Sequence, residues 1–269
     1  VRGLPHKLII LPVLALILFV LIMGIMGLLS AGIWGFVEVW RFPDILPEKW
    51  GLVSWRNGFA AYIPPFINTL IIGFITSILA LISAIIWLEY PAKSFSKVTE
   101  AVVYIPLLLP QTGFLFGMQV LIIWLEIDGL YITVIWAHYL FVFPYTLLTL
   151  GPIWRRFDVR YELLGASLGF SKFKRLWRIK MPLMVVPIIA SFAIGFAVSS
   201  ALYLPTIFAG NGTFLTLTTE AVTLAANASR QAAGIAALLQ MILPLVIFII
   251  AGIYIRFRLH NFSYFRISH

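Results

Sequence analysis

The sequence has no cysteine and very little charge. The absence of cysteine from all 269 residues excludes disulfide bonds, cysteine-ligated zinc sites and cysteine-ligated iron–sulfur clusters. Only 11% of the residues are Asp, Glu, Lys or Arg, whereas soluble domains carry about 25%. Mean hydropathy is +1.03, and 62% of the residues are hydrophobic. A chain this poor in charge is an integral membrane protein.

Long apolar runs, by contrast, are abundant. Six can cross a hydrocarbon core of about 30 Å as helices of roughly 20 residues, namely 8–33, 66–88, 100–123, 130–151, 183–206 and 233–255. The runs are continuous and do not alternate, which disfavours a transmembrane β-barrel. The first run is long for the core of a signal peptide and no clear small-residue cleavage site follows it, so we expect a retained, additional N-terminal helix. We predict an all-α polytopic protein with six transmembrane helices in one domain, residues 1–269.

Basic residues are distributed unequally between the two sets of loops. Of the 19 Lys and Arg residues, 15 fall on one side and 4 on the other. Cytoplasmic loops carry an excess of Lys and Arg, so the richer side is predicted to be cytoplasmic, and it includes both termini. Its basic residues are Arg2, Lys7, Lys93, Lys97, Arg155, Arg156, Arg160, Lys172, Lys174, Arg175, Arg178, Lys180, Arg256, Arg258 and Arg266.

The opposite side carries one notable loop, from about 35 to 65. It is rich in Pro and Trp and has balanced charge, as in "RFPDILPEKW". We expect a small ordered cap or interfacial segment. Its four Trp residues suit an aromatic belt at the level of the lipid headgroups better than a binding site; they are Trp34, Trp40, Trp50 and Trp55.

Acidic residues are missing from the middle of every apolar run. All ten lie in expected loops or at helix ends, and His138 is the only ionisable residue near the middle of a span. Transporters driven by proton or sodium gradients usually carry ionisable groups inside their helices. A lone histidine there is more often hydrogen-bonded to a neighbouring helix than part of a proton relay. A self-sufficient secondary transporter or channel, which would need His138 or another coupling group, is therefore the second-ranked alternative.

Motifs that would give the chain chemistry of its own are missing or out of place. It contains neither G-x-x-x-x-G-K-[ST] for ATP phosphates nor H-E-x-x-H for zinc. Gly165 to Gly169 matches G-x-S-x-G, but that motif requires a preceding strand and an acid and a histidine that activate the serine. An enzyme built on Ser167 is the weakest alternative, and close packing of short helices explains the small residues better. We assign no catalytic, cofactor-binding or metal-ligating residue, and no nucleic-acid partner.

Neutral polar residues do occur within the runs. Hydrogen bonds between helices are their ordinary use in a membrane, at about 0.6–2 kcal/mol each. A polar pathway between helices is the functional alternative, and prolines such as Pro106, Pro110 and Pro205 fit broken helices around it. The candidate pathway residues are Asn68, Gln111, Gln119, Ser199 and Ser200.

One segment, "ELLGASLGFSKFKRLWRIKMP" from Glu162 to Pro182, is unusually basic. Five of the 19 Lys and Arg residues fall within nine of its positions, 172 to 180. Placing these cations at the centre of a bilayer would cost roughly 2.5–3.5 kcal/mol each, so the segment is expected outside the membrane. Attraction to anionic lipid, about 1 kcal/mol per cation, would explain the charges but not an ordered pattern.

The pattern predicts two short helices. Asp158 lies near the start of the first, at 158–168, where an acid suits the helix dipole. Gly169 then breaks the chain, and Ser171 can cap a second helix that continues to about Lys180.

On the second helix Phe173, Leu176 and Trp177 have the i, i+3, i+4 spacing of an apolar stripe. Pro182 ends it as the next span begins. An apolar stripe with basic flanks suits insertion into a groove on another protein.

These residues resemble the cytoplasmic EAA loop of binding-protein-dependent type I ABC importer permeases, the MetI-like superfamily. The loop pattern is E-A-A-x-x-x-G, nine residues, then I-x-L-P. Gly169, Ile179 and Pro182 have this spacing, with Met181 in place of Leu. The E-A-A positions hold Leu163, Leu164 and Gly165, and Glu162 lies one residue early.

The segments "YIPLLLPQTGFLFG" and "LTTEAV" resemble permeases of thiamine, ferric-iron and polyamine importers. In those permeases "LTTEAV" would form an outward re-entrant segment or short helix before the last span. Some relatives fuse two permease halves, and we expect a single half here. The resemblance covers about residues 60–255.

The resemblance implies a permease that couples a translocation pathway to ATP hydrolysis on separate ABC ATPase subunits. Its other partners would be a second permease half, a periplasmic solute-binding protein and membrane lipid. The substrate would be a small water-soluble nutrient, carried across the bacterial inner membrane by alternating access. ATPase-coupling residues would lie in the loop at 152–182: Glu162, Leu163, Gly165, Ala166, Gly169, Phe170, Phe173, Trp177, Ile179 and Pro182.

Overall fold

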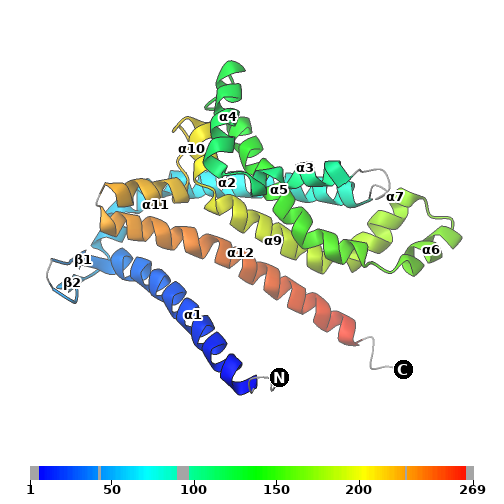
Figure 1. Cartoon of the computed structure of the whole chain (residues 1–269), viewed down its shortest axis with the longest axis horizontal. Helices are drawn as coiled ribbons and strands as arrows, with labels where there is room; N and C mark the ends of the chain where they lie inside the picture. Colours follow the sequence, from blue (N-terminus) through cyan, green and yellow to red (C-terminus); the bar gives the residue numbers. More distant parts are fainter. Residues whose placement is uncertain (1–5, 42–43, 90–96, 228, 265–269) are drawn as a thin grey trace, which may run out of the picture. The chain divides into compact units, whose positions relative to one another are not determined.

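The computed structural model describes residues 6–41, 44–89, 97–227 and 229–264, which are almost entirely helical (Figure 1). Its elements are α1 (His6–Phe36), β1 (Val37–Val39), β2 (Lys49–Trp50), α2 (Val53–Glu89), α3 (Lys97–Leu108), α4 (Gln111–Trp124), α5 (Tyr131–Arg155), α6 (Val159–Ser167), α7 (Lys172–Arg175), the π-helical turn η2 (Leu176–Lys180), α8 (Met181–Leu183), α9 (Val185–Ala201), α10 (Leu204–Gly210), α11 (Leu217–Ala226) and α12 (Arg230–Tyr264). Three residues used to predict the orientation, Arg2, Lys93 and Arg266, lie outside the described residues.

Four described helices are long and apolar enough to cross a membrane alone: Pro12–Phe36, Val53–Glu89, Tyr131–Arg155 and Arg230–Arg258. Two further spans qualify only as bent helix pairs, Ala101–Leu108 with Gln111–Trp124 and Lys172–Leu183 with Val185–Ala201. The described residues thus hold four to six candidate spans. The all-α membrane class is confirmed, and the location of both termini in the cytoplasm stays a prediction.

The predicted run 100–123 is not one straight helix, and the break that its prolines indicated lies at Pro110. The chain bends by 108° between α3 and α4, and Pro110 stands at the break with φ −55° and ψ 116°. Proline has no N–H to donate and disfavours helical geometry in the residue before it, here Leu109.

The predicted run 183–206 is also interrupted. Helix α9 ends at Ala201, Leu202 is extended, and α10 begins with Pro205 in its first turn. Proline is accommodated at a helix start because its missing N–H would be unpaired there in any case.

Contacts divide the chain into two compact units, each described here by itself. The first comprises the described parts of Val1–Tyr62 and Glu220–Leu239, and the second those of Ile63–Thr219 and Gln240–His269. The division falls within α2, α11 and α12. The short helix predicted at "LTTEAV" is confirmed as α11.

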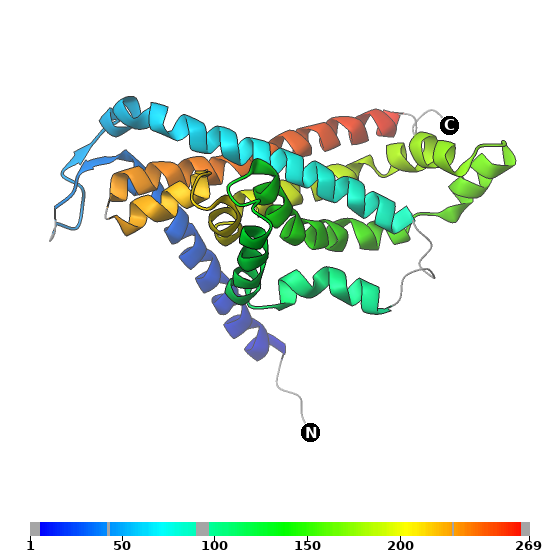
Figure 2. The same cartoon turned by 90° about the horizontal axis from the view of Figure 1, so that it is seen from above.

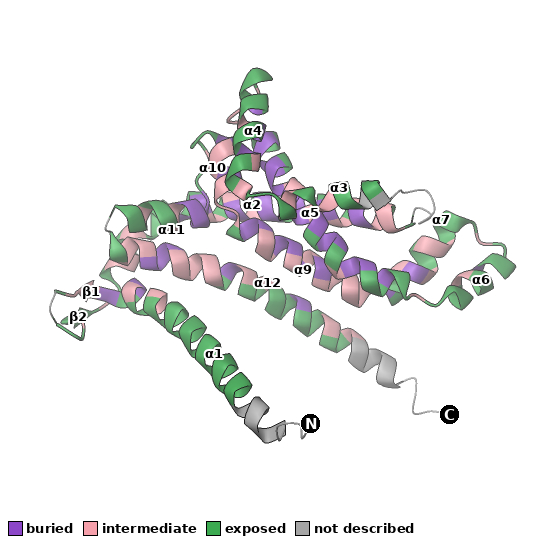
Figure 3. Ribbon diagram, in the orientation of Figure 1, coloured by how far each residue is buried: buried purple, intermediate pink, exposed green. Residues whose placement is uncertain are grey.

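In the first unit a small hairpin follows α1, so the predicted loop at 35–65 is ordered in its first part, whereas residues from Val53 onward belong to α2. Val37 pairs with Trp50 across β1 and β2, and Trp34 stacks on Trp40 with ring centroids 4.7 Å apart. The described side chains of α1 are exposed along most of their length, as expected for a lipid-facing helix (Figure 3).

The carboxylate of Glu38 joins this hairpin to the start of α2. It accepts the Val53 N–H at 3.1 Å and lies 3.1 Å from the Lys49 ammonium. Hydrogen bonding to Lys49, and then to Val53, holds the pKa of Glu38 below its usual value.

In the second unit α5 is the central helix. It packs along α9, and α10 lies against both α5 and α4 (Figure 1, Figure 2). One apolar cluster surrounds Phe141 of α5, and another surrounds Leu150 and Trp154 near its end. Gly73 of α2 allows a close approach to α9, because a Cβ there would lie 2.7 Å from the Phe196 ring.

Candidate functional site

The coupling loop (residues 152–182) begins with the two short helices expected from its sequence. Asp158 caps α6 by accepting the Arg160 N–H at 2.9 Å. Gly169 has φ +75°, the left-handed conformation that glycine adopts without strain. Ser171 then caps α7 by accepting the Lys174 N–H at 3.3 Å. The Ser171 cap, the position of Asp158 at a helix start and the break at Gly169 are therefore confirmed. The prediction that Pro182 ends the second helix is wrong, because the helical segment continues to Leu183.

Gly165 explains why small residues recur in this segment. It is buried, and a Cβ on it would lie 2.5 Å from Ile179 Cδ1 and 3.0 Å from Arg175 Cγ. Only a residue without a side chain lets α6 approach the second helix so closely. This is the close packing predicted as the better explanation of the G-x-S-x-G match.

The second helix is not a uniform α-helix, because α7 is followed by the π-helical turn η2. A π-turn rotates the residues after it relative to an α-helical register. Leu176, the first residue of this turn, packs inward against the apolar cluster around Trp154. Phe173 and Trp177 stay 71% and 55% exposed, with ring centroids 6.0 Å apart. The predicted single stripe is therefore wrong: one of its three residues faces inward and two face outward.

Most other expected coupling residues lie on the outside of the loop. Leu163 and Leu164 on α6 are 63% and 62% exposed. Ala166 and Pro182 are exposed too, while Phe170 and Ile179 are half-buried. The Lys174 ammonium lies over the Phe170 ring, 4.1 Å from the ring centroid. The loop thus presents apolar side chains flanked by cations.

Lys180 behaves differently from the other four cations of the basic segment. It is 8% exposed, and its ammonium ion-pairs with Glu89 at the end of α2 and, at 3.2 Å, with Glu162 of α6. Trp154 of α5 donates its indole N–H to the same Glu89 oxygen at 2.9 Å. We call Glu89, Trp154, Glu162 and Lys180 the Lys180 cluster.

The sequence analysis did not identify the Lys180 cluster, although one signal was present. Lys180 lies seven residues after Phe173, so an α-helical register would place it on the apolar stripe. Its partner Glu89 is 91 residues away in the sequence, and no local pattern connects the two.

The candidate pathway residues separate into lining and buried positions. Gln111 lines an open cavity of about 400 Å³ beside the α3–α4 bend, together with Tyr145 of α5 and Val198 of α9. Gln119 is half-buried on α4. Ser199 and Ser200 are buried instead, at 2% and 5% exposure.

The Asn68 side chain is hydrogen-bonded to other residues of the second unit. Its amide donates to the Leu215 carbonyl at 2.9 Å, and the Tyr131 hydroxyl donates to its side-chain oxygen. The neighbouring Thr69 hydroxyl accepts the Leu217 N–H at 2.9 Å. Together they fasten α2 to the segment that leads into α11.

His138 is hydrogen-bonded on both sides, as expected for a structural histidine. Its Nδ1 lies 2.9 Å from the Ser199 hydroxyl and its Nε2 lies 2.9 Å from the Thr206 hydroxyl. The Thr206 hydroxyl donates its only proton to the Leu202 carbonyl at 2.8 Å. Thr206 therefore accepts from Nε2–H, and Ser199 donates to Nδ1 of a neutral ring.

This His138 cluster (His138, Ser199 and Thr206) spans the α9–α10 break. Ser199 comes from the last turn of α9 and Thr206 from the first turn of α10. The buried His138 ring on α5 is thus hydrogen-bonded to the end of α9 and to the start of α10. Every polar atom of the ring is used within the protein.

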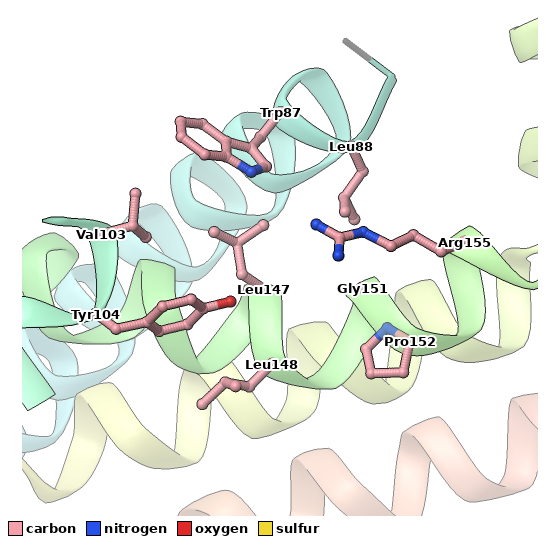
Figure 4. Close-up of a pocket in the computed structure, with 9 residues that line it drawn as sticks. All are labelled: Trp87, Leu88, Val103, Tyr104, Leu147, Leu148, Gly151, Pro152 and Arg155. Atoms are coloured by element: carbon pink, nitrogen blue, oxygen red, sulfur yellow. The ribbon is translucent and has the colours of Figure 1, made fainter. Parts of the chain in front are cut away.

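A second cavity, of about 160 Å³, lies where α2, α3 and α5 meet near the loop (Figure 4). The Arg155 guanidinium and the Tyr104 hydroxyl are directed toward it, and Leu88, Leu147 and Leu148 supply apolar walls. The lining of this cavity is therefore mostly apolar, with Arg155 and Tyr104 as its polar groups.

Comparisons with known proteins also point to a membrane transport protein. No model of a known protein family matches the chain. The chain is 38% identical over 187 residues to the inner membrane ABC transporter permease protein YnjC of Escherichia coli (strain K12). The match covers 70% of this chain and 36% of YnjC, so the chain spans little more than a third of that relative.

Two crystal structures share the fold. One is a bacterial alginate ABC transporter in complex with an alginate pentasaccharide-bound periplasmic protein, with a TM-score of 0.57, 18% identity and coverage of 91% of each chain. The other is a bacterial ABC transporter involved in the import of the acidic polysaccharide alginate, with a TM-score of 0.58, 18% identity and coverage of 98% and 96%. At this identity the likeness concerns the fold alone. Together with the YnjC match, it agrees with the resemblance stated from the sequence: this chain is a multi-pass inner membrane protein that is similar to ABC transporter permeases.

Proposed function

We propose that the chain is the transmembrane subunit of an ABC importer and that its coupling loop docks on a separate ATPase subunit. The observation that carries the proposal is the exposed apolar surface on a rigid loop. Phe173 and Trp177 are exposed on a capped helix, and the same loop is tied to the helix ends through Lys180. An exposed aromatic pair flanked by cations suits a groove on a partner protein.

The other partners follow from the importer class. A second permease half, the same or a related chain, would complete the pathway, and a periplasmic binding protein would deliver a small water-soluble nutrient. Both termini would lie in the cytoplasm. ATP hydrolysis would take place on the partner, and this chain would change conformation in response.

The secondary-transporter alternative finds less support. It needs an ionisable coupling group inside the spans, and His138 was the candidate. Both ring nitrogens of His138 are hydrogen-bonded to buried hydroxyls, in a neutral form that needs no further proton. This arrangement suits a structural clasp better than a proton relay.

The docking proposal is tested by co-purification. The full chain, isolated from its own membranes in mild detergent, is expected to retain an ATPase subunit. Phe173→Asp places a charge in the apolar contact and is expected to reduce retention at least tenfold, the equivalent of about 1.4 kcal/mol.

Ser171→Asp is the matched control, because it adds the same charge two residues away and keeps an N-cap residue on α7. It is expected to retain the ATPase. Equal retention by both variants and the unaltered chain would refute docking at Phe173.

The pathway is tested with single cysteines, which the chain naturally lacks. Gln111→Cys lies on the open cavity and is expected to react rapidly with a water-soluble maleimide. Ser199→Cys is buried and is expected to react at least tenfold more slowly, because a residue packed against His138 is not accessible to water. Equal rates at the two positions would exclude Gln111 from an aqueous pathway.

A further inference from the structure

Lys180 joins segments that are distant in the sequence. Its ammonium contacts the carboxylates of Glu89 on α2 and Glu162 on α6, and it lies 4.8 Å from the Trp154 ring centroid of α5. Three helices and the π-turn η2 thus meet at one cation. Of the other cations of the basic segment, Lys172, Lys174 and Arg178 are exposed, and Arg175 is half-buried beside Gly165.

Because Lys180 is buried, its ammonium requires these particular partners. Its side chain is only 10% exposed, so the ammonium has given up most of its water. A buried cation is tolerated only where carboxylates and other polar groups replace that water. Trp154 and Phe157 add ring faces at 4.8 and 5.5 Å from the ammonium. A single arrangement of the loop satisfies all of these groups.

Contacts within the loop join α6 to η2. Gly165 lets α6 pack on Ile179 of η2, and Glu162 and Lys180 pair across the same contact. The loop is attached to α2 through the ion pair of Lys180 with Glu89, and the Trp154 indole N–H of α5 donates to the same Glu89 carboxylate.

We propose that Lys180 is a positioning residue that ties the coupling loop to the cytoplasmic ends of α2 and α5, so that a force on the loop moves these helices with it. The inference rests on the proposed function of the loop as an ATPase contact. It also assigns Glu162 an internal partner: this carboxylate holds the loop together, and the docking surface consists of Phe173, Trp177 and their neighbours.

The tie is tested first in the full chain without any partner. Spin labels at Ile86→Cys on α2 and Ser167→Cys on α6 report the distance between helix and loop in lipid nanodiscs, and no native cysteine interferes. The unaltered background is expected to give one narrow distance distribution. Lys180→Met is expected to widen it roughly twofold, because the contact that favours one arrangement is lost.

Lys172→Met is the matched control, since it removes an exposed lysine from the same segment. It is expected to leave the distribution unchanged. A narrow distribution in Lys180→Met, identical to that of the control, would overturn the proposal.

Two further variants keep the test decisive if Lys180→Met folds poorly. Glu162→Gln releases α6 alone, and combining it with Lys180→Met is expected to add little further width, because both changes break one network. A combination of Lys180→Met, Glu89→Gln and Glu162→Gln removes all three charges and is expected to fold with a wide distribution. A narrow distribution in this neutral variant would likewise refute the tie.

A second arm uses the chain together with the ATPase that co-purifies with it. ATP is expected to leave the helix-to-loop distance unchanged in the unaltered chain and to change it in Lys180→Met, while both retain the ATPase. An ATP-driven distance change in the unaltered chain would contradict the tie. If no ATPase accompanies the unaltered chain, the proposed function fails, and the partner-free measurement still decides the role of Lys180.

Discussion

The second unit contains two polar clusters that are built on different principles. The Lys180 cluster is charged and lies where α2 and α5 end, whereas the His138 cluster is neutral and lies within the first half of α5, at the α9–α10 break. The first holds a cation between two carboxylates. The second is a set of hydrogen bonds among a neutral imidazole ring and two hydroxyl groups, in which every donated proton has an acceptor. Charge is expensive inside a bilayer, so a membrane protein uses ion pairs at helix ends and neutral hydrogen bonds within its spans.

This difference predicts that breaking the charged cluster has the largest effect. Lys180→Met leaves two carboxylates facing each other and is expected to lower the free energy of unfolding by about 3 kcal/mol. Replacing Glu89 and Glu162 by Gln in the same chain is expected to recover most of that loss. Denaturant unfolding in detergent measures both effects, and equal stabilities for the single and triple variants would show that the charges are not coupled.

The geometry of the charged cluster can be disturbed without changing any charge. Gly165→Leu places a side chain where Ile179 and Arg175 already lie, and it is expected to push α6 away from Lys180 at a cost of about 2 kcal/mol. Gly169→Asn is the comparison, because asparagine tolerates a positive φ and nothing lies near a Cβ at Gly169. The same unfolding measurement is expected to separate the two, and equal losses would contradict the close-packing role of Gly165.

Breaking the neutral cluster is expected to have a smaller effect. His138→Phe fills a similar volume and removes both ring hydrogen bonds, at a cost of about 1 kcal/mol, because Thr206 keeps its bond to the Leu202 carbonyl. Ser199 loses its acceptor. Thermal unfolding of the variant checks this, and a loss as large as that of Lys180→Met would mean that His138 carries charge.

The smallest effect is expected at the ion pair of Glu38 with Lys49 in the first unit. The folded-state pKa of Glu38 lies below its unfolded value, so its contribution is complete above the unfolded pKa and is lost as the pH falls through the folded pKa. Glu38→Gln is therefore expected to be slightly less stable than the unaltered chain near neutral pH. The difference between the two is expected to shrink as the pH falls below the unfolded pKa of about 4.3, and to vanish once the pH is below the lower, folded pKa of Glu38. Stability curves that stay parallel into acid would contradict this assignment.

Local features of the coupling loop were predictable from the sequence because local chemistry determines them. Asp158 and Ser171 are N-cap residues, Gly169 is the residue that accepts a positive φ, and Gly165 allows close packing. Capping and glycine conformations depend on the nearest few residues.

The remaining features depend on distant residues or on irregular backbone. The π-turn at Leu176–Lys180 is irregular backbone that no residue pattern in the segment specifies, and Leu176 packs inward because it meets the cluster around Trp154 of another helix. Burial of Lys180 requires Glu89 from another helix. The break at Pro110 was indicated by the proline itself, but no residue pattern specifies its angle of 108°.

The most direct measurement is site-specific photo-crosslinking from the exposed aromatic pair. With p-benzoylphenylalanine in place of Phe173, irradiation of the complex isolated from its own membranes is expected to yield a covalent adduct between this chain and an ATPase subunit. The same probe in place of Ile82, an exposed residue within the α2 span, is expected to yield none. An ATPase that co-purifies but forms no adduct at position 173 would contradict the account of the coupling loop.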